Sequence, residues 1–175
     1  MLKTILILLV VAIAAVLVYA ATRPDSFRVE RSVDIAAPPE KIYPLITDLH
    51  RWHDWSPYAK KDPAMQRTLS GADSGVGAAY AWKGNKAVGE GRMEIIEAMP
   101  PSRIRIRLDF IAPFQAHNLA EFSLVPEGKS THVTWALSGP SPFISRLIGV
   151  FMNMDKMIGG DFEVGLAQLK ILAES

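Results

Sequence analysis

His50 and His53 are the pair of side chains whose type and spacing most directly suggest chemistry. Three residues apart, they lie on one face of a helical turn, and together with Asp54 they could hold a metal ion or act as a base. No third ligand lies nearby in the sequence, and short polar helical stretches often carry such pairs. We therefore expect neither a metal ion nor a cofactor.

Five other ionisable side chains fall on segments that the sequence predicts to be strands. Because side chains alternate between the two faces of a strand, these five lie opposite the apolar residues, on the outer face of the sheet. There they are too dispersed for the paired carboxylates of acid–base catalysis. The sequence thus offers no catalytic constellation, and it leaves open whether the chain is an enzyme. The five residues are Glu94, Glu97, Asp109, His117 and Glu121.

Composition and charge exclude several classes of function. The chain has no cysteine, which excludes disulfides, thiolate catalysis and cysteine-type zinc sites. Without Lys3, the remaining 18 basic residues equal the 18 acidic ones, so there is no excess of positive charge for binding a nucleic acid. The glycines between Gly71 and Gly77 precede a predicted strand, whereas a dinucleotide-binding loop precedes a helix.

Periodicity predicts the elements that carry these residues. Residues 27–35 alternate apolar with polar, as a half-buried strand does. Two short helices are expected at 39–47 and 49–55, the second closed by Ser56-Pro57. Between 65 and 138, strand-like segments alternate with turn residues, including a tight hairpin at Gly84-Asn85. About seven antiparallel strands are therefore expected.

The C-terminal part changes to a helical period. Apolar residues recur at spacings of three, four or seven from Leu147 to Leu172, and Ser141-Pro142 is a typical helix start. One long helix is expected to cover one face of a curved sheet, which makes the fold class α+β. Four glycines in this helix indicate a close approach or an open space, with a bend packed on the sheet as the alternative: Gly149, Gly159, Gly160 and Gly165.

The predicted inner face of the sheet and the facing side of the helix are aromatic and rich in methionine. Small-molecule sites have this character, with a few polar groups such as Asn118 and the Tyr80 hydroxyl. The alternative is that these side chains fill the core, as Trp52 and Trp55 are expected to do by clamping the short helices onto the sheet. The candidate ligand-binding residues are Tyr80, Trp82, Met93, Phe110, Asn118, Trp135, Phe151, Met154, Ile158 and Phe162.

The N-terminus carries an uncharged apolar run from Thr4 to Ala21. Its 18 residues would span about 27 Å as a helix, close to the thickness of a bilayer core. We expect a single-pass membrane anchor over residues 1–22 and a folded domain over 23–175, on the extracytoplasmic side. The alternative is a cleaved signal peptide, because Val18-Tyr19-Ala20 resembles a cleavage site.

The order of these elements, with several local sequences, resembles the START-like (SRPBCC) superfamily and its polyketide cyclase/dehydrase branch. The similar segments are IAAPPEKIYPLITDLHRWHDWSP (35–57), GVGAAYAWKGN (75–85), AEFSL (120–124) and MDKMIGGDFEVGLAQLK (154–170). The resemblance implies a helix-grip fold, with a hydrophobic cavity between the sheet and the long helix. The superfamily includes lipid carriers, receptors, cyclases and co-chaperone-like domains, so the fold alone names neither ligand nor reaction.

Three functions remain open at this point. The first is a monomeric, membrane-tethered module that binds or transfers a lipid or other apolar small molecule. The second is an enzyme of the cyclase, dehydrase or hydrolase type on the same cavity, which would need an ionisable group facing that cavity. The third is a co-chaperone-like interaction module, which would depend on surface patches instead of a cavity.

Overall fold

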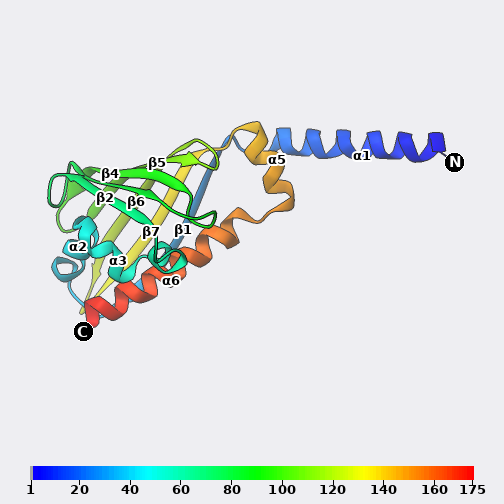
Figure 1. Ribbon diagram of the computed structural model, residues 1–175. Helices are drawn as coiled ribbons and strands as arrows, with labels where there is room; N and C mark the ends of the chain where they lie inside the picture. Colours follow the sequence, from blue (N-terminus) through cyan, green and yellow to red (C-terminus); the bar gives the residue numbers. More distant parts are fainter. Residues whose placement is uncertain (1) are drawn as a thin grey trace.

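A computed structural model describes residues 2–175 (Figure 1). The apolar helix α1 (Leu2–Thr22) projects away from an α+β domain, as Figure 1 shows. The domain has the helix-grip arrangement: a seven-stranded antiparallel sheet, a cluster of short helices and a long C-terminal helix. In chain order its elements are β1 (Ser26–Ile35), α2 (Pro39–Thr47), η1 (Leu49–Arg51), α3 (Trp52–Trp55), α4 (Pro57–Lys61), β2 (Gln66–Gly71), β3 (Ala78–Lys83), β4 (Glu90–Met99), β5 (Arg103–Ala112), β6 (Ala116–Glu127), β7 (Ser130–Pro140), α5 (Phe143–Phe151) and α6 (Met154–Glu174).

The strands are ordered β1-β7-β6-β5-β4-β3-β2, and every neighbouring pair is antiparallel. The register defines two ends of the sheet. Ser26 lies opposite Pro140, and Phe110 lies opposite Ala116, so the start of β1 and the β5–β6 turn share one end with the β3–β4 loop. We call this the anchor end, after the expected anchor helix α1 that precedes β1 there. The opposite end, near Ile35, is the far end.

Helix α6 runs along β1 from the anchor end to the far end. Near its start, Arg31 of β1 donates to Asp155 (Nη2–Oδ2 2.9 Å) and to Glu163 (Nε–Oε1 2.8 Å). Near its end, Lys170 Nζ donates to the Asp34 carbonyl at 2.7 Å. The hydrogen bond from Arg31 is the main cause that lowers the pKa of Asp155. These contacts fix α6 across one side of the sheet.

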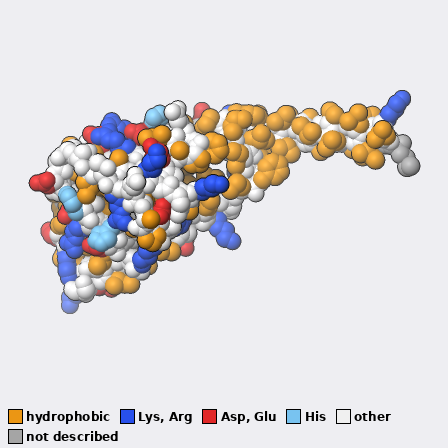
Figure 2. Space-filling model, viewed as in Figure 1, with side chains coloured by type: hydrophobic (Ala, Val, Ile, Leu, Met, Phe, Trp, Pro, Cys, Tyr) orange, Lys and Arg blue, Asp and Glu red, His pale blue; other side chains and the backbone are white. Residues whose placement is uncertain are grey.

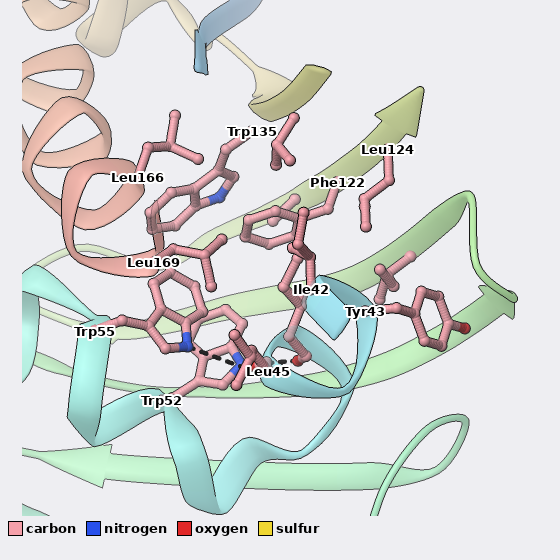
Figure 3. Packing of buried hydrophobic residues seen from close by; sticks show 14 of the residues in the cluster. Ile42, Tyr43, Leu45, Trp52, Trp55, Phe122, Leu124, Trp135, Leu166 and Leu169 are labelled. Atoms are coloured by element: carbon pink, nitrogen blue, oxygen red, sulfur yellow. Dashed lines mark hydrogen bonds between the residues drawn. The ribbon is translucent and has the colours of Figure 1, made fainter. Parts of the chain in front are cut away.

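The middle and the far end of the space between sheet and helices are filled by aromatic side chains (Figure 3). Trp135 stacks on Phe162 with ring centroids 4.0 Å apart and on Phe122 at 5.0 Å. Trp52 and Trp55 pack against the same group, and each indole N–H donates to a carbonyl of α2, at 2.8 Å and 3.0 Å. Both tryptophans therefore clamp the short helices onto the sheet, as expected.

The long C-terminal helix differs from the prediction. It is broken at Met152–Asn153 into α5 and α6, and the Asn153 side chain accepts a hydrogen bond from Lys156 N (2.9 Å) as the N-cap of α6. Asparagine is among the best N-cap residues, so a helix starts here although the apolar period continues through the break. Ser141 is not the cap of α5, because Pro142 occupies that position.

Two of the helix glycines have a packing reason. A Cβ at Gly159 would overlap the Arg31 guanidinium, and one at Gly165 would lie 2.8 Å from the Trp135 ring and 3.0 Å from Pro57. Gly160 has no such neighbour. Close approach thus explains Gly159 and Gly165.

Two predicted turns are also different. The β3–β4 connection is a six-residue loop, 84–89, and not a tight hairpin, because Asp62 accepts a hydrogen bond from Asn85 N (2.7 Å) and holds the loop open. Pro57 does not close the short helices but begins a further one, α4. Its ring fits the first turn of a helix, where no N–H donor is required.

Candidate ligand-binding face at the anchor end

The candidate residues divide into three groups, of which the first belongs to the core. Met93, Trp135 and Phe162 are 6%, 3% and 2% exposed. Trp135 lies between the Phe122 and Phe162 rings, and its buried Nε1 atom has no hydrogen-bond partner among the described residues. Its burial places the ring in the core, and contact of Trp135 with a ligand stays a prediction.

A second group is half-buried and lies on the inner face towards the anchor end. Tyr80, Leu108 and Asn118 occupy one row across the sheet, and Trp82 and Phe110 occupy the next row. The Tyr80 and Trp82 rings stack at 6.3 Å, and Trp82 meets Phe110 edge to face at 5.7 Å. We call these five residues the inner anchor-end face.

Local sequence explains why these rings are fixed in position. Gly91 lies opposite Trp82 on β4, and a Cβ at this position would meet the Trp82 ring, so glycine makes room for the indole. The Trp82 indole N–H donates to the Val88 carbonyl at 3.0 Å, which ties the ring to the β3–β4 loop. Ile158 of α6 is half-buried and packs against the core from the helix side.

The inner anchor-end face contains two polar groups. The Asn118 Oδ1 atom is buried and accepts no hydrogen bond from any described residue; it lies over Gly139, where no side chain intervenes. Burial raises the pKa of Tyr80, so its phenol stays protonated and can donate. A buried acceptor without a donor costs about 1–3 kcal/mol.

The third group does not lie between the sheet and α6. Phe151 is 75% exposed at the end of α5, and Met154 is 41% exposed at the start of α6. Helix α5 contacts α1. Phe151 therefore does not face the sheet as predicted, because the break at Met152–Asn153 turns α5 away, and Met154 is exposed at the first position of α6.

Two hollows stand out on the part of the chain that the structure describes. One, of about 150 Å³, lies between η1 and β2–β3, and the other, of about 230 Å³, is lined by residues of β2, β3, β4 and β5. Neither is bounded by α6. Neither hollow therefore lies between the inner face of the sheet and α6, where the resemblance implies a cavity.

The five ionisable strand residues lie on the outer face; parity predicts this for four of them, and Glu97 reaches the outer face because a β-bulge between Ile95 and Glu97 shifts the alternation. Arg107 pairs with Glu94 at 2.7 Å, Arg105 with Glu97 at 3.2 Å, and Asp109 with His117 at 2.7 Å. Arginine hydrogen bonds lower the pKa of Glu97. These groups form a charged surface ladder and are not positioned for catalysis on an inner ligand.

The two histidines of the short helices do not share a ligand position. His50 Nδ1 lies 3.0 Å from Asp48, and His53 Nδ1 lies 3.1 Å from Asp54. Three ligand-type side chains that sequence reasoning missed meet at the far end: Asp34, Glu127 and His132, with candidate ligand atoms within 4.8 Å of one another. The cross-strand pairing of Asp34 with His132 brings them together, and no sequence spacing could show it.

Comparison with known proteins identifies the domain. Residues 26–174 match the family model described as polyketide cyclase / dehydrase and lipid transport. The chain belongs to this family. No curated protein is significantly similar to it.

Several solved structures share the fold. A protein of Thermobifida fusca is 25% identical, with a TM-score of 0.61 over 82% of this chain and 90% of its own. The Aha1 dimer from Colwellia psychrerythraea is 18% identical, with a TM-score of 0.57 over 85% and 96%. The di-domain ARO/CYC BexL of the BE-7585A biosynthetic pathway is 13% identical, with a TM-score of 0.62 over 90% of this chain and 53% of its own.

Proposed function

We propose that this protein is a membrane-tethered module that binds or transfers a lipid or another apolar small molecule on its inner anchor-end face. The observation that carries the proposal is the face itself: aromatic rings held half-buried, beside a buried Asn118 oxygen that lacks a donor. A binding site combines such apolar area with a few oriented polar groups. The phrase "lipid transport" in the family description supports the same class of ligand.

The tether is α1. Its 21 residues correspond to about 31 Å of helix, enough to cross a bilayer core, and the run from Thr4 to Ala21 has no charged side chain. Helices of this kind also occur as signal sequences, so retention in the mature protein is part of the proposal. We place the domain over residues 23–175 and on the extracytoplasmic side, since a short basic N-terminus before an apolar run is typical of export.

The tether and the inner anchor-end face lie close together, which supports exchange of the ligand with the membrane. The register puts the start of β1, and therefore the end of α1, at the same end of the sheet as Trp82 and Phe110. An apolar ligand leaving the bilayer would then cross little water. We expect one chain to suffice for binding, so the unit is a monomer.

Native mass spectrometry of the full chain, released from membranes in mild detergent, tests binding. We expect a co-purifying apolar molecule, and its loss in Trp82→Ala, since this ring forms the centre of the face. Ile96→Ala, at an exposed position of β4, is the matched control and should keep the ligand. Equal occupancy in all three proteins, or none in the unaltered chain, would contradict the proposal.

The alternative function is an enzyme of the cyclase, dehydrase or hydrolase type at the same place. Tyr80 is the ionisable group of the inner anchor-end face, and its protonated phenol could donate to a reacting carbonyl. Similarity in fold to the ARO/CYC protein BexL supports this alternative. Turnover of a bound ligand that disappears in Tyr80→Phe, while binding persists, would favour the enzyme over the carrier.

A further inference from the structure

Helix α5 has an apolar side that no described residue covers. None of its nine residues is buried, and Ile144, Ile148 and Phe151 are 63%, 39% and 75% exposed. Their spacing of four and three residues places them on one side of the helix. Leu147 and Val150, elsewhere on the helix, are half-buried. Such a stripe is unusual on a surface that faces only water.

The neighbour of α5 is the end of the anchor helix (Figure 1). Arg146 donates to the carbonyls of Ala21 (3.3 Å) and Arg23 (3.0 Å), and Arg23 donates to the Gly149 carbonyl at 2.6 Å. These bonds satisfy carbonyls that the end of α1 would leave without partners. The two arginines thus lock α5 beside α1.

Burial on α1 shows how far this contact extends. Ala20 is fully buried and Val16 is half-buried, whereas the rest of α1 is exposed. Val16 lies six residues before Thr22, so the contact covers about 9 Å of helix length. If α1 crosses the bilayer, these 9 Å are the last part of the span, which ends at the boundary between headgroups and acyl chains. Interfacial amphipathic helices lie about 5–10 Å deep at that boundary.

Other exposed apolar side chains occur at the same end of the sheet. The β5–β6 turn carries Phe114, which is 73% exposed, and Ile111, the last residue but one of β5, is 52% exposed. Met152 and Met157, on either side of the α6 start, are both 50% exposed. Figure 2 shows the hydrophobic surface of α1 continuing onto the adjoining part of the domain.

From this continuity we propose that α5 is an interfacial helix whose Ile144–Phe151 side inserts into the lipid bilayer, and that Phe114 approaches the same surface. The occupant of the apolar stripe is lipid. The inference rests on the proposed tether, and it adds an orientation: the end of the inner face that carries Trp82 lies towards the bilayer surface. A ligand could then pass between the membrane and the inner anchor-end face without full exposure to water.

The absence of cysteine makes a direct test possible. The full chain, reconstituted in vesicles of phosphatidylcholine and phosphatidylglycerol, is labelled with the fluorophore NBD in single variants Ile144→Cys and Phe151→Cys. Both labels should emit at shorter wavelength than in water and lose emission when the vesicles contain nitroxide-labelled lipid. Val125→Cys, on β6 towards the far end and 49% exposed, is the matched control and should show neither change.

A label at Ile13→Cys separates failure of the tether from failure of this inference. If Ile13 is quenched by lipid-borne nitroxide while Ile144 and Phe151 behave like Val125, the tether stands and the interfacial role of α5 is wrong. If Ile13 is also unquenched, both are wrong. If the α5 labels are shielded from water but insensitive to nitroxide lipid, protein covers the stripe, as in a second copy of this chain, and the lipid assignment is overturned.

Discussion

The two halves of the space between the sheet and the helices contain the same kinds of residue, but these residues have different surroundings. In the middle and at the far end, Trp52, Trp55 and Trp135 are buried, and the indole N–H groups of the first two have backbone partners, whereas that of Trp135 has none among the described residues. At the anchor end, Trp82 and Phe110 are half-buried beside an acceptor that no described residue satisfies. Composition does not distinguish the halves. What differs is coverage: three short helices and α6 close one half and leave the other open.

The largest effect is expected in the closed half. Trp135→Ala removes a ring that stacks on Phe122 and Phe162, and it should lower the free energy of unfolding by about 3–5 kcal/mol. Denaturant titration measures this. A loss near 1 kcal/mol would mean that the ring borders space, contrary to the packing described above.

Two glycines of α6 test the difference in packing between the closed half and the anchor end. Gly165→Ala forces a Cβ against Trp135 and Pro57 and should destabilise by about 1–3 kcal/mol. Gly160→Ala, nearer the anchor end, meets nothing within 4 Å and should stabilise by up to about 1 kcal/mol through helix propensity. Thermal unfolding of both variants checks the signs, and effects of the same sign would contradict the difference in packing.

In the open half, one substitution should have a small effect on stability and a large effect on ligand binding. Trp82→Ala should cost only about 1 kcal/mol of unfolding free energy, because the ring is half-buried, yet abolish ligand occupancy. Denaturant titration and native mass spectrometry on the same preparation measure both quantities. A large loss of stability together with unchanged occupancy would place Trp82 in the core instead.

The smallest effect concerns the start of α6. The pKa of Asp155 is lowered by Arg31, so its stabilising contribution is present above the ordinary carboxylate pKa and is lost as the pH falls through the lowered value. Hydrogen exchange in the first turns of α6 should accelerate on acidification, and Arg31→Gln should remove this pH dependence. Arg28→Gln, which breaks only an exposed pair with Glu30, is the control and should retain it.

Strand alternation was sufficient to predict most of the inner face of the sheet. Each strand places alternate residues inward, so Tyr80, Trp82, Phe110 and Asn118 were assigned to the inner face from sequence alone. The same rule correctly put Glu94 on the outer face. Parity could not show which inner residues are covered, because coverage depends on where the short helices pack.

Helical periodicity failed at Phe151 for a related reason. The apolar period continues through Met152–Asn153, but a period defines only a face and not its partner. The Asn153 cap redirects the chain, and α5 packs on α1, an element from the opposite end of the sequence. Only the three-dimensional structure shows that contact.

Photocrosslinking with a lipid that carries a diazirine in its acyl chain tests the central claim most directly. The full chain in vesicles should give crosslinked peptides from β3 and β5, around Trp82 and Phe110, besides those expected from α1. Trp82→Ala should lose the β3 and β5 products and keep those of α1, while Ile96→Ala should keep all of them. Crosslinks confined to α1 and α5 in the unaltered chain would show a membrane-bound protein that takes up no lipid, and would contradict the proposed function.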